Sequence, residues 1–195
     1  MSSLKSTYKQ ILSDYPSENP TFIKCLVARY LNPSYSVLFS YRVGYYLYHS
    51  KNRFLRLLAS RIRMKLIFKK NCDVSFLSSI GKRLRFAHPI GVVIGAGVAI
   101  GNNVTIFQNV TLGSNGKNGQ AKSYPIIEDN VVIYADSIIA GKVRIGNNAV
   151  IGAKTLVTPI QIPDAQKTQN NGKLHFFPNA REHPKNEMVN ILGKI

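Results

Sequence analysis

Aliphatic residues recur at every sixth position through much of the second half of the chain. They form two runs: Ile94, Ile100, Ile106 and Leu112, then Ile127, Ile133, Ile139, Ile145, Ile151 and Val157. An α-helix repeats every 3.6 residues and a half-buried strand repeats every two, so neither structure produces this spacing. One buried aliphatic residue in six predicts a parallel β-helix, in which three hexapeptides close a triangular coil of about eighteen residues. The spacing therefore predicts a mainly β fold.

An insertion separates the two runs. Leu112 and Ile127 lie fifteen positions apart instead of six, so nine extra residues leave the coil between them. They belong to residues 113–125, GSNGKNGQAKSYP, which are rich in glycine, asparagine and lysine. A protruding loop on a rigid stack is a natural binding element, and its basic, glycine-rich composition suits phosphates. A neutral surface insertion is the alternative interpretation.

The first 70 residues have a helical pattern and a strong positive charge. The chain carries 26 Lys and Arg against 9 Asp and Glu, a formal charge of +17, and residues 51–70 alone hold eight basic residues and no acid. Apolar residues of this segment recur at helical spacing: Leu55, Leu58, Ile62 and Leu66. Two to four short helices are expected here. The charge indicates an anionic partner, such as an acidic polymer, a phosphorylated cofactor or an acidic membrane surface, unless it only solvates a helix face. No nucleic-acid-binding motif accompanies it, so nucleic acid is not expected.

The remaining composition indicates an ordinary cytoplasmic protein. Cys25 and Cys72 make neither a disulfide framework nor a metal cluster. The first residues, MSSLKSTYKQ, lack the apolar core of a signal peptide, and no window approaches the roughly 20 apolar residues of a spanning helix. We expect a cytoplasmic location, with residues 51–70 suited to peripheral association with the inner face of the membrane.

Three stretches within residues 72–157 have further characteristic motifs: CDVSFLSSIGKRLRFAHPIGVVIG, NNVTIFQNVTLGSNGKNG and PIIEDNVVIYADSIIAGKVRIGNNAVIGAKTLV. These stretches resemble the hexapeptide-repeat acyltransferases, in the branch of serine O-acetyltransferase and the related polysaccharide O-acetyltransferases. The resemblance implies left-handed β-helices that assemble as a homotrimer, with acetyl-CoA in the groove between neighbouring prisms. It implies O-acetyltransferase activity and no metal.

The resemblance places a catalytic pair on His88 and Asp73. In the family, a histidine acts as the general base on the acceptor hydroxyl, and an aspartate fifteen positions earlier orients it. A positioned base of this kind contributes about 10²–10⁴-fold to the rate. A zinc ligand and a structural corner histidine are the alternatives. Zinc is disfavoured because the other histidines, His49, His175 and His183, lie outside the repeats.

The resemblance also indicates where acetyl-CoA binds. Small residues let a pantetheine arm lie close to the prism, and lysines bind phosphates as point charges. The expected donor-site residues are Gly113, Ser114, Lys117, Ala135, Ala153 and Lys154. Lys154 is explained equally well as an exposed corner lysine.

Two positions depart from the serine O-acetyltransferases. Ala87 stands where those enzymes have an aspartate, and Ser123–Tyr124 stands where they have an Arg-His pair that helps to recognise the amino acid. We therefore expect the acceptor to be a sugar hydroxyl of a cell-surface polysaccharide, such as a capsule, or of its precursor, bound by Tyr124 and Gln108. Serine O-acetyltransferase is the alternative enzyme. A basic protein that binds anionic polymers is the alternative without catalysis.

These patterns divide the chain into three parts. Residues 1–71 form a basic helical region, residues 72–160 form the β-helix with the loop 113–125, and residues 161–195 form a C-terminal tail. The tail lacks a hexapeptide period. Packing is the expected role of its aromatic cluster, His175, Phe176 and Phe177.

Overall fold

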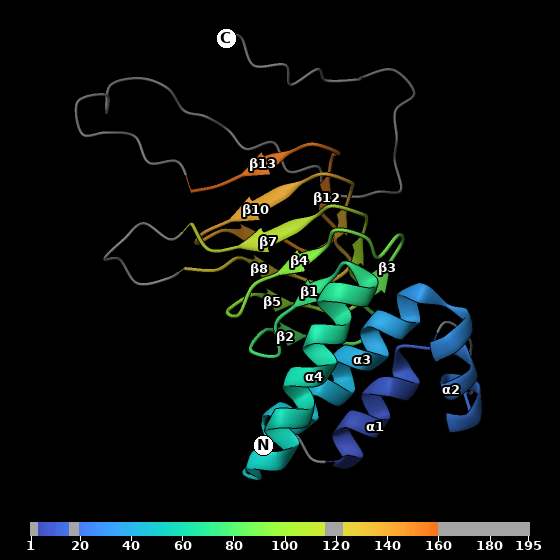
Figure 1. Ribbon diagram of the computed structural model, residues 1–195. Helices are drawn as coiled ribbons and strands as arrows, with labels where there is room; N and C mark the ends of the chain where they lie inside the picture. The colour runs from blue at the N-terminus through green and yellow to red at the C-terminus, as the bar shows by residue number, and fades with distance from the viewer. Residues whose placement is uncertain (1–3, 16–19, 116–122, 160–195) are drawn as a thin grey trace, which may run out of the picture.

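The computed structural model describes residues 4–15, 20–115 and 123–159. Within these ranges four α-helices precede a stack of short strands (Figure 1). The helices are α1 (Leu4–Ser13), α2 (Phe22–Leu31), α3 (Pro33–Tyr48) and α4 (Arg53–Lys70). None of these helices is long and apolar enough to cross a membrane. The expected tail 161–195 and most of the loop 113–125 lie outside the described residues.

The strands form the three sides of a prism. They are β1 (Asp73–Val74), β2 (Ser79–Ile80), β3 (Arg85–Phe86), β4 (Val93–Ile94), β5 (Ala99–Ile100), β6 (Thr105–Ile106), β7 (Thr111–Gly113), β8 (Ile126–Ile127), β9 (Val132–Ile133), β10 (Ile138–Ala140), β11 (Arg144–Ile145), β12 (Val150–Ile151) and β13 (Leu156–Val157). Every third strand joins the same parallel sheet, in the orders β1-β4-β7-β10-β13, β2-β5-β8-β11 and β3-β6-β9-β12. The parallel β-helix predicted from the six-residue period is confirmed (Figure 1).

The second residue of every strand points into the prism. All of these side chains are 7% exposed or less. Val74, Ile80 and Phe86 keep the six-residue period, so the stack begins one coil earlier than the aliphatic runs alone indicated. Burial of each Leu or Ile stabilises the fold by about 1.5–3 kcal/mol relative to exposure, so this column is the main source of the prism's stability.

The strand register shows where residues leave the stack. Val93 pairs with Thr111, and Ile138 pairs with Leu156, in each case eighteen positions further along the chain. Thr111 instead pairs with Ile138, twenty-seven positions further along. The difference of nine is the insertion between Leu112 and Ile127, which leaves the stack without disturbing the coils on either side.

Asparagine occupies the left-handed backbone conformation at several corners. Asn103, Asn109, Asn130 and Asn148 have φ between 56° and 62°. Their amides also join successive coils, since Asn103 Nδ2 donates to Asn130 Oδ1 at 3.1 Å and Asn109 Nδ2 donates to Asp136 Oδ1 at 2.9 Å. Asparagine tolerates this conformation better than most residues, which explains its recurrence at the corners.

Helix α3 packs over the first coil of the prism. The Tyr41 hydroxyl donates to the Ser78 carbonyl at 2.8 Å, and burial raises the pKa of Tyr41 to about 12, which keeps the phenol a neutral donor. The Phe76 ring lies against α3 at Gly44, where a Cβ would meet Phe76 Cζ at only 2.1 Å. The helical region therefore closes the first coil of the prism at one end.

A buried ion pair fastens α1, α3 and the prism together. Arg42 Nε lies 2.7 Å from Asp14 Oδ2, and the two side chains are only 3% and 1% exposed. The Arg42 guanidinium also donates to the carbonyls of Ile80, at 2.7 Å, and of Gly81. Asp14 accepts the Arg83 backbone N–H at 2.7 Å. Burial raises the pKa of Asp14, and the nearby Arg42 charge opposes that rise.

Replacing Arg42 by methionine is expected to destabilise the protein by about 3–5 kcal/mol, because it leaves a buried carboxylate without its cation. Urea denaturation measures the loss, and adding Asp14→Asn should recover part of it. The matched control is Arg144→Met, which breaks an ion pair with Glu128 whose arginine is 67% exposed and should cost about 1 kcal/mol or less. Equal losses for the two arginine variants would contradict the structural role of Arg42.

Candidate functional site

The corner between β3 and β4 contains two extra residues. Phe86 and Ile94, the core residues on either side, lie eight positions apart instead of six. The coil that includes this corner is accordingly twenty residues long, as the pairing of Asp73 with Val93 shows. His88 lies within the enlarged corner, and its side chain is exposed. The insertion therefore enlarges the corner at which the imidazole is exposed.

Backbone hydrogen bonds hold the enlarged corner in place. The Ile90 N–H donates to the His88 carbonyl at 2.9 Å, and the Gly91 N–H donates to the Asn71 carbonyl at 2.8 Å. Gly91 has φ of 68°, and a Cβ there would lie 2.2 Å from Asn109 Oδ1. Only glycine fits this turn, so the position of His88 is fixed by the backbone around it.

His88 faces a cavity of about 510 Å³ between the helical region and the prism. The walls come from the α2–α3 turn, the end of α4 and the β3–β4 corner. The polar and charged residues that line it are Asn32, Ser34, Lys69, Lys70 and His88. The lining includes no acid, and burial lowers the pKa of Lys70, which donates to Ser36 Oγ at 2.7 Å. The cavity therefore favours an anionic or neutral ligand group.

Aromatic rings continue from His88 along the prism. The His88 ring lies edge-on to Phe107, with centroids 6.4 Å apart, and Phe107 lies 4.9 Å from Tyr134. Successive rings belong to successive coils, so they line one edge of the prism. They provide an apolar surface beside the imidazole.

Asp73, the expected partner of His88, is bound by an arginine. Arg63 of α4 contacts it three times, at 3.0 Å from Nε and 2.8 Å from Nη2 to Oδ1, and at 3.1 Å from Nη2 to Oδ2. The two side chains are 43% and 37% exposed. Among the described residues, no hydrogen bond joins Asp73 to His88, so the orienting role of Asp73 remains a prediction. The sequence pattern did not predict that the side chains of Arg63 and Asp73 would meet.

Four of the sequence-derived candidates lie on the same edge of the prism as His88. Gln108, Ala135 and Ala153 occupy equivalent corner positions on successive coils, since the Asp136 N–H donates to the Gln108 carbonyl and the Lys154 N–H donates to the Ala135 carbonyl. Lys154 has φ of 58° and is exposed at this corner. Gln108 Oε1 is buried with no hydrogen-bond partner among the described residues. The two alanines place small side chains on the same edge as the aromatic rings.

The other candidates lie on a different edge. Gly113 ends β7 and Ser114 follows it, and the Tyr124 ring packs against Gly95 and Gly97, which follow β4. This edge is separated from that of His88 by the whole sheet β1-β4-β7-β10-β13. Lys117 lies outside the described residues. One protomer therefore does not bring the two groups of candidates together.

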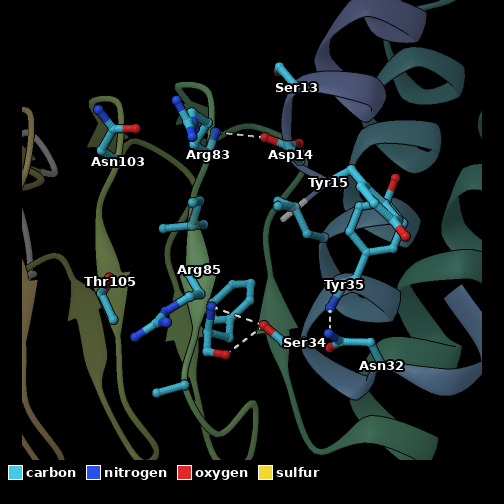
Figure 2. Close-up of a pocket in the computed structure, with 14 residues that line it drawn as sticks. Ser13, Asp14, Tyr15, Asn32, Ser34, Tyr35, Arg83, Arg85, Asn103 and Thr105 are labelled. Atoms are coloured by element: carbon cyan, nitrogen blue, oxygen red, sulfur yellow. Dashed lines mark hydrogen bonds between the residues drawn. The ribbon is translucent and has the colours of Figure 1, made fainter. Parts of the chain in front are cut away.

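A larger cavity, of about 630 Å³, adjoins the one that holds His88, and both are lined by Asn32, Ser34 and Ala87. Figure 2 shows Arg85 extending from β3 toward Thr105, its register partner on β6. Among the described residues, no ion pair or hydrogen bond engages the Arg85 side chain. The sequence analysis did not select Arg85 as a site residue. Its place as the outward-facing residue of a two-residue strand, three positions before His88, could have indicated it.

Ser34 connects these cavities to the backbone of β3. Its hydroxyl donates to the Phe86 carbonyl and accepts the Phe86 N–H at 3.1 Å (Figure 2). Asn32 caps α3, because its Oδ1 accepts the Tyr35 N–H at 3.1 Å. The cavity walls on the helical side are thus tied to the prism rather than free to move. No group of three metal-binding side chains occurs in residues 4–15, 20–115 or 123–159.

Comparison with known proteins gives a consistent result. The family profile Bacterial transferase hexapeptide (six repeats) matches residues 124–159. Serine acetyltransferase of Buchnera aphidicola is 37% identical over 150 residues, which are 76% of this chain and 52% of that protein. Serine acetyltransferase of Bacillus licheniformis is 34% identical over 155 residues, 75% of this chain and 70% of that protein. The chain therefore spans about half the length of the Buchnera protein.

Solved structures agree with these relatives. Serine acetyltransferase of Neisseria gonorrhoeae in complex with serine has a TM-score of 0.65 at 27% identity, over 79% of this chain and 63% of that chain. A serine acetyltransferase in complex with CoA has a TM-score of 0.61 at 25% identity, over 80% of this chain and 63% of that chain. The matched residues make up a larger share of this chain than the prism does. The similarity therefore includes residues of the helical region as well as the prism.

The expectation of a polysaccharide O-acetyltransferase is wrong. Every relative and structure described above is a serine acetyltransferase. The expectation depended on the side chains at Ala87 and Ser123–Tyr124, and two changed recognition positions are weaker information than identity over about 150 residues. The fold, the period and the relatives together show that the chain belongs to the hexapeptide-repeat acyltransferases, in the serine acetyltransferase branch.

Proposed function

We propose that the chain is an O-acetyltransferase that moves the acetyl group of acetyl-CoA to the hydroxyl of serine. The observation that carries the proposal is the exposed His88, which a two-residue insertion places in a cavity between helices and prism. The similarity to serine acetyltransferases, one in complex with serine and one in complex with CoA, supports the choice of both substrates.

The chemistry needs one base and no protein nucleophile. The imidazole of His88 removes the proton from the serine hydroxyl as that oxygen attacks the thioester carbonyl. The tetrahedral intermediate then collapses, the C–S bond breaks, and the imidazolium returns the proton to the departing sulfur. The products are O-acetylserine and CoA. A carboxylate such as Asp73 would stabilise the imidazolium if it turned from Arg63 toward the ring.

The donor site is proposed to lie between two protomers of a homotrimer. His88, Ala135 and Ala153 lie on one edge of the prism, whereas Gly113 and Ser114 lie on another. Acetyl-CoA contacts both groups only if the second edge comes from a neighbouring chain. The exposed Lys154 is then available for the phosphates, as a flexible point charge.

The acceptor carboxylate is proposed to bind Arg85 instead of the Arg-His pair that Ser123–Tyr124 replaces. Arg85 has no partner among the described residues and lies in a cavity that shares walls with that of His88. Lys69 and Lys70 line the adjoining cavity of His88. Because the lining of the His88 cavity has no acid, serine would bind through its carboxylate more than through its ammonium group.

His88→Ala is expected to lower kcat/KM for acetyl transfer to serine by about 10²–10⁴-fold, the usual contribution of a general base. Release of CoA, followed with a thiol reagent, measures the rate. Asp73→Asn should lower kcat less, because an orienting group acts through the imidazole. His49→Ala, on an exposed histidine at the end of α3, is the control and should leave the rate unchanged. Full activity of His88→Ala would overturn the assignment.

Arg85→Ala is expected to raise the KM for serine about tenfold or more with little change in kcat, because it removes a charge-assisted hydrogen bond made in the ground state and transition state alike. The wild type should prefer serine to serinamide and accept N-acetylserine, and Arg85→Ala should lose the preference over serinamide. Lys82→Ala, an exposed cation outside both cavities, serves as the charge control. An unchanged KM in Arg85→Ala would exclude Arg85 as the carboxylate site.

A further inference from the structure

Helix α4 has two apolar faces, and only one of them is packed. The packed face contains Ala59 and Leu66, which are buried against α3 and the start of the prism. The opposite face exposes large apolar side chains: Phe54 71%, Leu57 59%, Leu58 41%, Met64 50% and Phe68 72%. At about 100° per residue these five side chains fall within an arc of about 120°. They form one stripe along the helix, here called the α4 stripe.

The α4 stripe is too regular to be scattered surface residues. Single exposed apolar residues are normal on a protein surface, but five on one face of a helix, each 41–72% exposed, mark an interaction site. The helix is fastened from behind by the ion pair of Arg63 with Asp73 and by Lys70, which donates to Ser36. These contacts on the packed face fix the orientation of α4, so that the stripe faces away from the rest of the protein. Figure 1 shows α4 running along the outside of the helical region to the start of β1.

The charges around the stripe identify the kind of partner. Arg61 and Lys65 are exposed within the same arc, and Arg53 and Lys69 are exposed along its borders. Residues 51–70 include eight basic residues and no acid. A second copy of the chain placed on this face would bring like charges together, which disfavours that occupant. An acidic lipid surface instead attracts the basic residues and accepts the apolar ones.

We propose that the α4 stripe docks on a membrane surface that contains acidic phospholipids. The helix lies in the plane of the interface, with the apolar side chains at the level of the acyl chains. The long stems of Arg61 and Lys65 reach from the same face toward the phosphates. Since Lys69 borders the stripe and also lines the cavity of His88, docking places that cavity close to the lipid headgroups.

The test uses the full chain and vesicles sedimented at increasing lipid concentration. Vesicles of phosphatidylcholine with phosphatidylglycerol at roughly 7:3 should bind the wild type, and vesicles of phosphatidylcholine alone should bind it at least about tenfold more weakly. Phe54→Ser/Phe68→Ser should weaken binding to the acidic vesicles by about tenfold or more. Arg61→Glu/Lys65→Glu should weaken it similarly, and added salt should weaken binding by the wild type.

Leu156→Ser is the matched control, because Leu156 is 67% exposed on β13, at the end of the prism remote from the helices (Figure 1). It should bind like the wild type, and circular dichroism checks that every variant is folded. Equal binding by Phe54→Ser/Phe68→Ser and the wild type would overturn the proposal. So would the absence of wild-type binding to the acidic vesicles. A lower oligomeric mass of the same variant in light scattering would also overturn it, because α4 would then cover another copy of the chain.

Discussion

The column of buried aliphatic residues, one in every six, is the constraint on which the rest of the structure depends. Each strand is only two or three residues long, so backbone pairing within one coil is slight, and stability comes from stacking one coil on the next. The column sets the length of each side of the prism and therefore where every corner lies. Residues added at a corner leave the stack without disturbing it. The two elements of the prism that are proposed to be functional are both additions of this kind.

The larger addition is the loop after β7, and the smaller one is the enlarged corner that contains His88. The smaller one contains the proposed base, and its imidazole is exposed. Backbone hydrogen bonds of Ile90 and Gly91 hold the corner in place. The helical region completes the site. The Arg42–Asp14 ion pair and Ser34 fasten that region, which supplies one wall of both cavities, to the first coil.

The fold was predictable because its main stabilising term is periodic in the sequence. The two extra residues between Phe86 and Ile94 put the first coil out of phase with the later aliphatic runs, so those runs did not extend back to it. His88 was singled out by the family resemblance, and it lies at a corner that interrupts the period. The Arg63–Asp73 ion pair and the free Arg85 were not, since long side chains on separate elements meet according to helix docking that no local pattern records. The division of the donor candidates between two edges also required the sheet order. The acceptor was mispredicted because a few side chains in the site were weighed above similarity along the whole chain.

The hydroxyl that accepts the acetyl group is proposed to lie at His88. The most direct test is a crystal structure of the chain with CoA and serine bound together. The serine Oγ should lie within about 3.2 Å of a ring nitrogen of His88, the reach of a general base. The serine carboxylate should lie at Arg85 and the pantetheine arm along Ala135 and Ala153. Serine bound away from His88, with the CoA thiol at some other edge of the prism, would contradict the proposed role of His88.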